Sequence, residues 1–272
     1  MPADQSDSPD PAVRLGLPPG ITACLFDLDG VLTSTAVVHK AAWKTAFDAF
    51  LKVRDGDDFQ PFTDTDYTHY VDGKPRADGV RDFLASRDIT LPEGSPDDPP
   101  DSPTINGMGN KKNVDLLRRI RDDGVQPYEG SVRYLQAARD AGLRRAVVSS
   151  SANCRDVVHA AGLDDLLEAR VDGSTAAAQG LKGKPAPDTF LAGAKQLGVQ
   201  PRHAAVFEDA TAGAQAGKAG GFGAVIGVDR VQDGAHADDL VRHGATVVVR
   251  DLAELLEERS GAGTTTTTGP GA

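Results

Sequence analysis

The sequence has few of the residues that mark secreted, membrane or nucleic-acid-binding proteins. Only two of its 272 residues are cysteines, Cys24 and Cys154. This argues against a disulfide scaffold and favours a reducing, cytoplasmic compartment. No apolar run approaches the ~20 residues that a membrane span requires, and the N-terminus MPADQSDSPDP lacks the basic and apolar regions of a signal peptide. Lys and Arg number 29 against 40 Asp and Glu, and the resulting net charge of −11 argues against a nucleic-acid surface.

The residues that are present indicate a parallel α/β core. Apolar runs expected to be buried strands alternate with helical patterns, and several junctions carry glycine, as helix ends do. This alternation predicts a Rossmann-like, doubly wound parallel sheet covered by helices. The strands are expected at 21–26, 144–149, 204–208, 223–228 and 246–249, and the helices at 131–141, 153–161, 187–197, 211–219 and 251–258.

Residues 36–124 interrupt this alternation, because they have helical or irregular patterns without strong strand signals. We expect them to form an inserted α-helical cap domain, with residues 19–35 and 125–259 forming the catalytic core. Within the cap, residues 92–103 (PEGSPDDPPDSP) hold five prolines and four acids and are expected to form a loop. The polar ends of the chain, 1–18 and 260–272, are expected to be disordered tails.

The strongest chemical signal is a pair of acids directly after the first expected strand, Asp27 and Asp29, followed by Gly30. Ligands of parallel sheets bind beyond the carboxyl ends of the strands. One carboxylate there can attack phosphorus while the other transfers a proton. Gly30 permits a sharp turn and a close approach to a ligand. Taken alone, the motif is as easily an ordinary acidic turn.

Three further motifs follow later strands or precede a helix. Ser149 begins a serine run at an expected helix start, where a hydroxyl and free N–H groups can hold phosphate, although such a serine is equally often a simple N-cap. Lys184 can neutralise a phosphoryl oxygen, although a single lysine is usually solvated. Glu208 and Asp209 offer the hard oxygen ligands that Mg²⁺ prefers, although acid pairs are more often charged loops. Their order and shared strand-end positions make coincidence improbable, about one chance in twenty.

With these four motifs in this order, the chain resembles the haloacid dehalogenase superfamily over about residues 21–258. Within it, three stretches are similar to the β-phosphoglucomutase family: Asp27 to Thr35 with His39 and Trp43, Lys184 to Asp188, and Glu208 to Gly213. The resemblance implies that Asp27 forms an aspartyl-phosphate and that Asp29 is the general acid and base. It implies Mg²⁺ held by Asp27, the backbone carbonyl of Asp29 and Asp209, with Glu208 nearby. Phosphate contacts would come from Ser149 and Lys184, with Ser150 and Asn153 as weaker candidates.

The resemblance also assigns residues to the cap. Thr35 would lie at the hinge, and His39 would orient the general acid and base, although a histidine sharing a helix face with Trp43 is more often structural. Arg76 would grip the second, non-transferring phosphate, for which its planar guanidinium is suited. The alternative for Arg76 is an exposed turn residue. Lys112 is a weaker candidate for a further cap contact.

The reaction implied by the resemblance is conversion of β-glucose 1-phosphate to glucose 6-phosphate. A sugar-phosphate phosphatase with the same phosphoenzyme is the alternative, since only the attacking group differs. A non-catalytic interaction module is a third possibility, which the intact set of acids and lysine disfavours. The expected partner is a small sugar phosphate, with no nucleic acid and no membrane, and the chain is expected to be a monomer. The segment 92–103 has no counterpart in the compact family members.

Overall fold

A six-stranded parallel sheet forms the centre of the computed structural model, which describes residues 10–232 and 234–257. The strand order is β3-β2-β1-β4-β5-β6. β1, β2, β4 and β5 are buried almost throughout, as strands covered by helices on both faces must be. The predicted Rossmann-like fold class is therefore confirmed. The strands are β1 (Ala23–Phe26), β2 (Arg144–Val148), β3 (Ala169–Val171), β4 (Ala204–Glu208), β5 (Ala224–Val228) and β6 (Val247–Val249).

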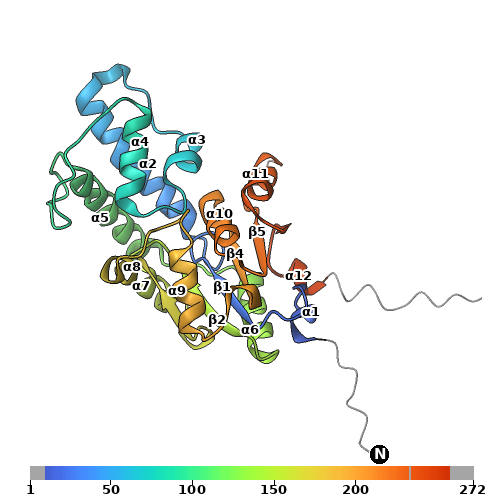
Figure 1. The fold of residues 1–272 in the computed structure, drawn as a ribbon. Helices are drawn as coiled ribbons and strands as arrows, with labels where there is room; N and C mark the ends of the chain where they lie inside the picture. Colours follow the sequence, from blue (N-terminus) through green and yellow to red (C-terminus); the bar gives the residue numbers. More distant parts are fainter. Residues whose placement is uncertain (1–9, 233, 258–272) are drawn as a thin grey trace, which may run out of the picture.

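Helices cover both faces of this sheet (Figure 1). On one face, Cys24 and Phe26 pack with residues of α6 and α7 and with apolar residues of the segments 12–17 and 252–255. On the other face, Ala23 and Leu25 pack with α9 and α10. Alternate residues of β1 thus serve two separate cores, as the two-residue period of a strand requires. The core helices are α6 (Glu129–Asp140), α7 (Cys154–Ala160), α8 (Gly173–Gln179), α9 (Asp188–Gln196), α10 (Thr211–Ala219), α11 (Ala235–His243) and α12 (Glu254–Glu257), with short 3-10 turns at Asp164–Leu166 and Pro201–His203.

The N-terminal segment corrects one prediction, because residues 10–18 are not a disordered tail. Asp10 caps the short helix α1 (Pro11–Arg14) by accepting from the backbone N–H of Ala12 at 2.9 Å. Ala12, Leu15 and Leu17 are buried in the core, and the Tyr134 hydroxyl donates to the carbonyl of Leu15 at 2.9 Å. Buried apolar side chains therefore hold this segment in place. Residues 1–9 and the predicted tail 260–272 lie outside the described residues.

Residues 35–123 form a helical unit beside the sheet (Figure 1). This unit has an aromatic core of its own. The ring of Phe47 contacts the rings of Trp43, Phe62 and Phe83. This separate core is what the proposed cap domain, residues 36–124, requires. Its helices are α2 (Thr35–Asp55), a 3-10 turn (Gly56–Asp58), α3 (Asp64–Asp66), a π-helical turn (Tyr67–Val71), α4 (Arg76–Ser86) and α5 (Ile105–Asp123).

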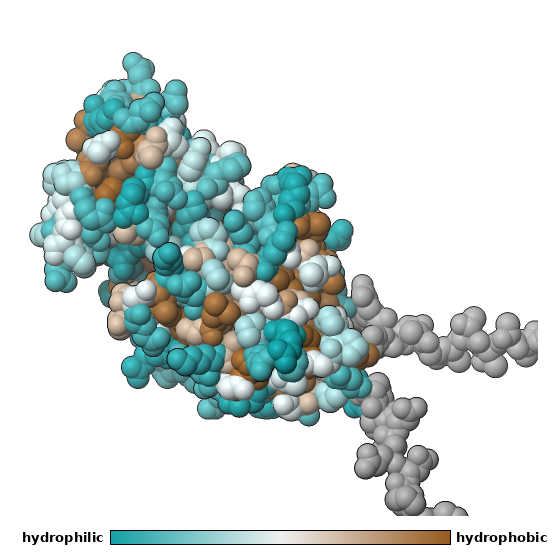
Figure 2. Space-filling view, viewed as in Figure 1, coloured by the Kyte–Doolittle hydropathy of each residue, from teal (hydrophilic) through white to brown (hydrophobic). Residues whose placement is uncertain are grey.

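The chain leaves and re-enters the core at adjacent points. Thr33 pairs with Pro127 in an isolated antiparallel bridge, and the backbone N–H of Ser34 donates to the carbonyl of Gln126 at 2.9 Å. The cap is thus connected to the core by two neighbouring chain segments. The face of the molecule shown in Figure 2 is largely hydrophilic, with apolar residues in scattered groups. No helix in the described ranges is both long and apolar enough to cross a membrane.

Candidate active site

The two motif acids lie immediately beyond the end of β1, where the sequence places them. The backbone N–H of Asp27 donates to the carbonyl of Phe207 at 2.9 Å, which continues the pairing of β1 with β4. Gly30 has a φ of +86°, and a Cβ there would lie 1.7 Å from Oδ2 of Asp209. Glycine is therefore required at this position for two reasons: the left-handed backbone and the close approach of Asp209.

Lys184 lies between two carboxylates at the bottom of the site. Its Nζ is 2.5 Å from Oδ1 of Asp27 and 2.5 Å from Oε1 of Glu208, and it donates to the carbonyl of Val148 at 3.2 Å. All three ammonium protons therefore have acceptors. Burial raises the pKa of Asp27 to about 6 and that of Glu208 to about 7, and the charge of Lys184 opposes both shifts. Although burial disfavours its charge, the same two carboxylates hold the pKa of Lys184 above its ordinary value.

Asp27, Glu208 and Asp209 form an acidic cluster that could hold a metal ion, since one oxygen from each lies within 4.8 Å of the others. Among the described residues, neither oxygen of Asp209 has a hydrogen-bond or ion-pair partner. Burial, with the charges of Asp72 and Glu208 adding to it, raises the pKa of Asp209 well above its ordinary value. A buried carboxylate without a partner is costly. A divalent cation bound to these oxygens would supply the missing countercharge, so the residues fit a hard metal ion.

The second motif acid is connected to the cap. Asp29 accepts a hydrogen bond from the hydroxyl of Thr35, the first residue of α2, and its Oδ1 is 3.6 Å from Nε2 of His39. Burial and the charges of Lys112 and Arg76 hold the pKa of His39 well below its ordinary value, which favours the neutral imidazole. Burial raises the pKa of Asp29 and lowers that of Lys112 to about 7.

The protonation of Lys112 governs which ring nitrogen of His39 carries the proton. Nζ of Lys112 lies 3.1 Å from Nδ1 of His39, and an ammonium group can only donate. When Lys112 carries its proton, Nδ1 is the acceptor and the ring proton is on Nε2, which is buried, has no hydrogen-bond partner among the described residues and lies 3.6 Å from Oδ1 of Asp29. In that state the cap presents an N–H group toward the second acid.

The serine region beyond β2 contacts the cap as well as the site. Ser149 is buried, and its hydroxyl accepts from the backbone N–H of Ser151 at 3.1 Å. Ser150 donates to the carbonyl of Gly73 at 2.8 Å, and Nδ2 of Asn153 donates to Oδ1 of Asn113 at 2.8 Å. Both weaker phosphate candidates therefore bridge core and cap in this structure. Their contact with a phosphoryl group stays a prediction.

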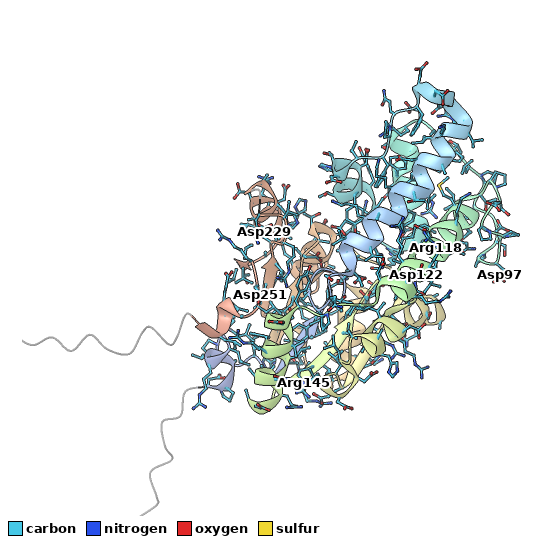
Figure 3. All side chains as sticks on the ribbon, turned by 180° about the vertical axis from the view of Figure 1, so that it is seen from behind. Asp97, Arg118, Asp122, Arg145, Asp229 and Asp251 are labelled. Carbon is cyan, nitrogen blue, oxygen red and sulfur yellow. The ribbon has the colours of Figure 1, made fainter. Side chains whose placement is uncertain are left out.

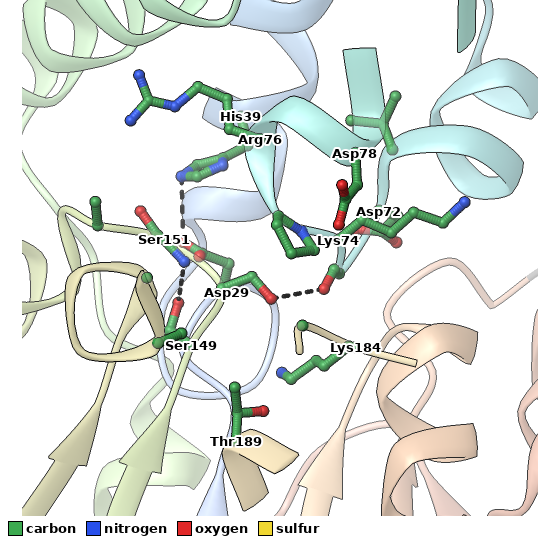
Figure 4. A pocket seen from close by; sticks show the side chains of 18 of the residues that line it. Asp29, His39, Asp72, Lys74, Arg76, Asp78, Ser149, Ser151, Lys184 and Thr189 are labelled. Atoms are coloured by element: carbon green, nitrogen blue, oxygen red, sulfur yellow. Dashed lines mark hydrogen bonds and ion pairs between the residues drawn. The ribbon is translucent and has the colours of Figure 1, made fainter. Parts of the chain in front are cut away.

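These residues line one pocket of about 650 Å³ between core and cap. Figure 4 shows His39, Arg76 and Asp72 entering it from the cap side, and Asp29, Ser149 and Lys184 from the core side. A Cβ on Gly183 would lie 2.1 Å from Cγ of Pro75, so core and cap are in close contact here. The pocket brings together every site residue that the sequence predicts except Thr35 and Glu208, which contact it through Asp29 and Lys184.

The sequence reasoning missed several lining residues, among them Tyr67, Asp72, Asn113 and Thr189. Burial raises the pKa of Asp72 to about 6, and the charge of Glu208 adds to the shift, so this cap acid faces the acidic cluster. Its position four residues before Arg76 was the only sequence signal. Thr189 has a buried hydroxyl without a partner among the described residues, and nothing in its sequence context distinguishes it.

The fold and this arrangement of acids, lysine and serine agree with a match to one protein family. A family model described as haloacid dehalogenase-like hydrolase matches residues 21–221, and the chain belongs to that family. The predicted superfamily resemblance is thus confirmed.

Proteins named β-phosphoglucomutase are among the relatives of this chain. The chain is similar to the β-phosphoglucomutase of Mycobacterium tuberculosis, with 56% identity over 253 residues that cover 90% of this chain and 97% of that protein. It is 31% identical to the β-phosphoglucomutase of Bacillus subtilis over 239 residues, 87% and 96% of the two chains. The crystal structure of a β-phosphoglucomutase from Clostridium difficile shares the fold, with a TM-score of 0.67, 23% identity and coverage of 88% and 94%.

Proposed function

We propose that this chain is a magnesium-dependent phosphomutase that interconverts β-glucose 1-phosphate and glucose 6-phosphate through an aspartyl-phosphate. Membership of the family and the 56% identity to a protein named β-phosphoglucomutase support an enzyme of this type. The observation that carries the proposal is the pocket itself. It combines the Asp27–Lys184 pair on the core side with Arg76, a cation without a carboxylate partner among the described residues, on the cap side.

The first half of the reaction takes place on the core side. A carboxylate oxygen of Asp27 attacks phosphorus, the bond from phosphorus to the sugar or donor oxygen breaks, and the proton of Asp29 goes to that leaving oxygen. Ser149 and Lys184 hold the transferring phosphoryl group. A magnesium ion held by Asp27, Asp209 and the backbone carbonyl of Asp29, with Glu208 nearby, would neutralise the charge that repels the nucleophile from the phosphate. Transfer to the sugar reverses these steps, with Asp29 now accepting the proton of the attacking hydroxyl.

The cap decides which hydroxyl attacks. Nε2 of His39 lies 3.6 Å from Oδ1 of Asp29, and Thr35 donates to the same carboxylate. Cap contacts thereby set the position of the general acid and base. The bisphosphate intermediate must turn end for end, so one phosphate has to be held while the other reacts. We assign the distal phosphate to Arg76 and give Lys112 a weaker supporting role, because both cations enter the same pocket.

The test compares isomerisation with hydrolysis. β-Glucose 1-phosphate, primed with a trace of glucose 1,6-bisphosphate and followed by ³¹P NMR, should give glucose 6-phosphate with little free phosphate. Arg76→Ala should lose isomerisation far more than hydrolysis of acetyl phosphate, which is too small to reach the cap. Arg118→Ala is the matched control, since Arg118 also lies on a cap helix but is exposed and pairs with Asp115 and Asp122 of that same helix.

Two outcomes would contradict the proposal. Free phosphate as the main product, with no 6-phosphate formed from any sugar 1-phosphate, would make the chain a phosphatase. Absence of any phosphoenzyme after incubation with acetyl phosphate and magnesium would instead favour a non-catalytic module.

A further inference from the structure

The guanidinium of Arg76 is held in a defined position by the first turns of α5. Its Nη1 donates to Oδ1 of Asn110 at 2.9 Å and to the carbonyl of Gly109 at 3.4 Å. The aliphatic part of the arginine lies directly on Gly109, where a Cβ would come within 2.9 Å of its Cδ. Gly109 therefore permits the close approach, and Asn110 fixes one edge of the guanidinium.

Asn110 is in turn oriented by the proline-rich segment (residues 92–103). Its Nδ2 donates to the carbonyls of Pro96 and Asp98, each at 2.9 Å. Carbonyl oxygens only accept, so the amide cannot turn over without losing both hydrogen bonds. Oδ1 must then point to Arg76. The proline-rich segment thus decides which end of the Asn110 amide the arginine meets.

The proline-rich segment contributes almost no apolar burial, and its residues are largely exposed. Asp97, labelled in Figure 3, lies at the outer edge of the cap, away from the sheet. Hydrogen bonds from the start of α5 hold the segment. The Thr104 hydroxyl donates to Oδ2 of Asp98 at 2.6 Å, and Nδ2 of Asn106 donates to the carbonyl of Glu93 at 2.9 Å. A segment held by polar contacts rather than by packing is suited to positioning another polar group.

The remaining donors of Arg76 are available to a ligand. Within the described residues, its Nε and Nη2 have no acceptor, and no carboxylate lies within ion-pair distance. The nearby acid Asp78 pairs with Arg81 instead. Two parallel N–H donors of one guanidinium match two oxygens of a phosphate. Because Asn110 is an amide and not a carboxylate, it orients Arg76 without cancelling its charge.

We propose that the proline-rich segment and Asn110 form a positioning device that presents Arg76 to the non-reacting phosphate of a sugar bisphosphate. This inference rests on the proposed function, and it gives the segment 92–103 a part in substrate selection. Asn110 is a positioning residue, because it acts through Arg76. Its loss should weaken binding of ligands that carry a distal phosphate and leave chemistry at Asp27 unchanged.

The test measures binding apart from turnover. Glucose 1,6-bisphosphate and inorganic phosphate are titrated by calorimetry, with magnesium, into the full chain carrying Asp27→Asn, which cannot turn over. Adding Asn110→Ala should weaken bisphosphate binding roughly tenfold, the effect of one hydrogen bond worth about 1.4 kcal/mol. Inorganic phosphate binding should not change. Asn110→Asp, which keeps the size but neutralises Arg76, should weaken bisphosphate binding at least as much.

Asn106→Ala is the matched control. Asn106 also holds the proline-rich segment through its Nδ2 but does not contact Arg76. Because Asn110 still bonds to the carbonyls of Pro96 and Asp98 in this variant, its bisphosphate affinity should fall much less than that of Asn110→Ala. Thermal unfolding should show both alanine variants folded. Equal affinities of the parent and Asn110→Ala would overturn the proposal, as would equal losses in the Asn106 and Asn110 variants. If Asn110→Ala does not fold, the Asn110→Asp result decides. A parent that binds bisphosphate no better than inorganic phosphate would instead refute the proposed mutase and its distal site.

Discussion

Replacement of Lys184 by methionine removes the cation that lies between two buried carboxylates. The side chain of Lys184 is 1% exposed, and those of Glu208 and Asp27 are 0% and 10% exposed. Methionine has a similar volume, so the change mainly removes charge and three hydrogen bonds. Loss of one partner from a buried ion pair costs about 3–5 kcal/mol, because it leaves an uncompensated charge. Since domains of this kind unfold with about 5–15 kcal/mol, the metal-free variant should be marginally stable at neutral pH.

The loss of unfolding free energy in Lys184→Met should depend on pH in a defined direction. Burial already raises the pKa of Asp27 to about 6 and of Glu208 to about 7. A carboxyl group whose pKa is higher in the folded than in the unfolded protein contributes its full stability only below its unfolded pKa, near 4. That stability is lost as the pH rises through the pKa of the folded protein. Without Lys184 both pKa values rise further, so the difference between wild type and Lys184→Met should be large at pH 8 and small at pH 5.

Urea unfolding with a chelator present, at pH 5 and pH 8, measures this difference. Lys182→Met is the matched control, because Lys182 is exposed two residues away and should change stability by less than about 0.5 kcal/mol. Adding Glu208→Gln to Lys184→Met should recover part of the loss at pH 8, since one of the two uncompensated charges is gone. A loss under about 1 kcal/mol at pH 8, or an equal loss at both pH values, would refute the reasoning.

Three further predictions concern the chemistry. Asp27→Asn should keep the fold but abolish turnover and labelled phosphoenzyme; substantial retained labelling would remove Asp27 from the nucleophile's role. Asp29→Ala should slow phosphoenzyme formation and loss by roughly 10²–10⁴-fold, but much less for a leaving group that needs no proton; equal losses for both substrates would make Asp29 structural. A chelator should abolish activity and magnesium should restore it, and Gly30→Ala should raise the magnesium concentration required, because its Cβ would displace Asp209. An unchanged magnesium dependence in Gly30→Ala, measured by titration, would contradict that argument.

The sheet could be predicted from the sequence where strands are fully buried. The expected strands at 21–26, 144–149, 204–208, 223–228 and 246–249 match β1, β2, β4, β5 and β6 to within two residues. β3 was missed because Ala169–Val171 is three residues long and has an exposed arginine in its centre. α8 and α11 were also missed, since α8 has no buried residue and α11 only two. Short elements with little burial leave no hydrophobic period to read.

The core of the site could be predicted because parallel strands end at one edge of the sheet. Asp27 follows β1, Ser149 follows β2 and Asp209 follows β4, and this edge gathers them with Lys184. Contacts between the cap and its own loop could not be predicted in this way. The hydrogen bond from Arg76 to Asn110 joins residues 34 positions apart, and it depends on a loop without periodicity.

The bridge between Thr33 and Pro127 has a consequence for how such a protein could be rebuilt. The cap begins just after Thr33 and ends just before Pro127, and these two residues pair. The cap is therefore an insertion whose two ends lie side by side in the core. We expect that a short glycine linker could replace the whole cap without disrupting the sheet, because the six described strands lie outside the cap. The shortened protein would keep the acids and Lys184 but expose them to bulk water. Water would then be the main acceptor of the phosphoryl group. Selectivity among sugars would have to come from whichever cap domain was inserted in its place.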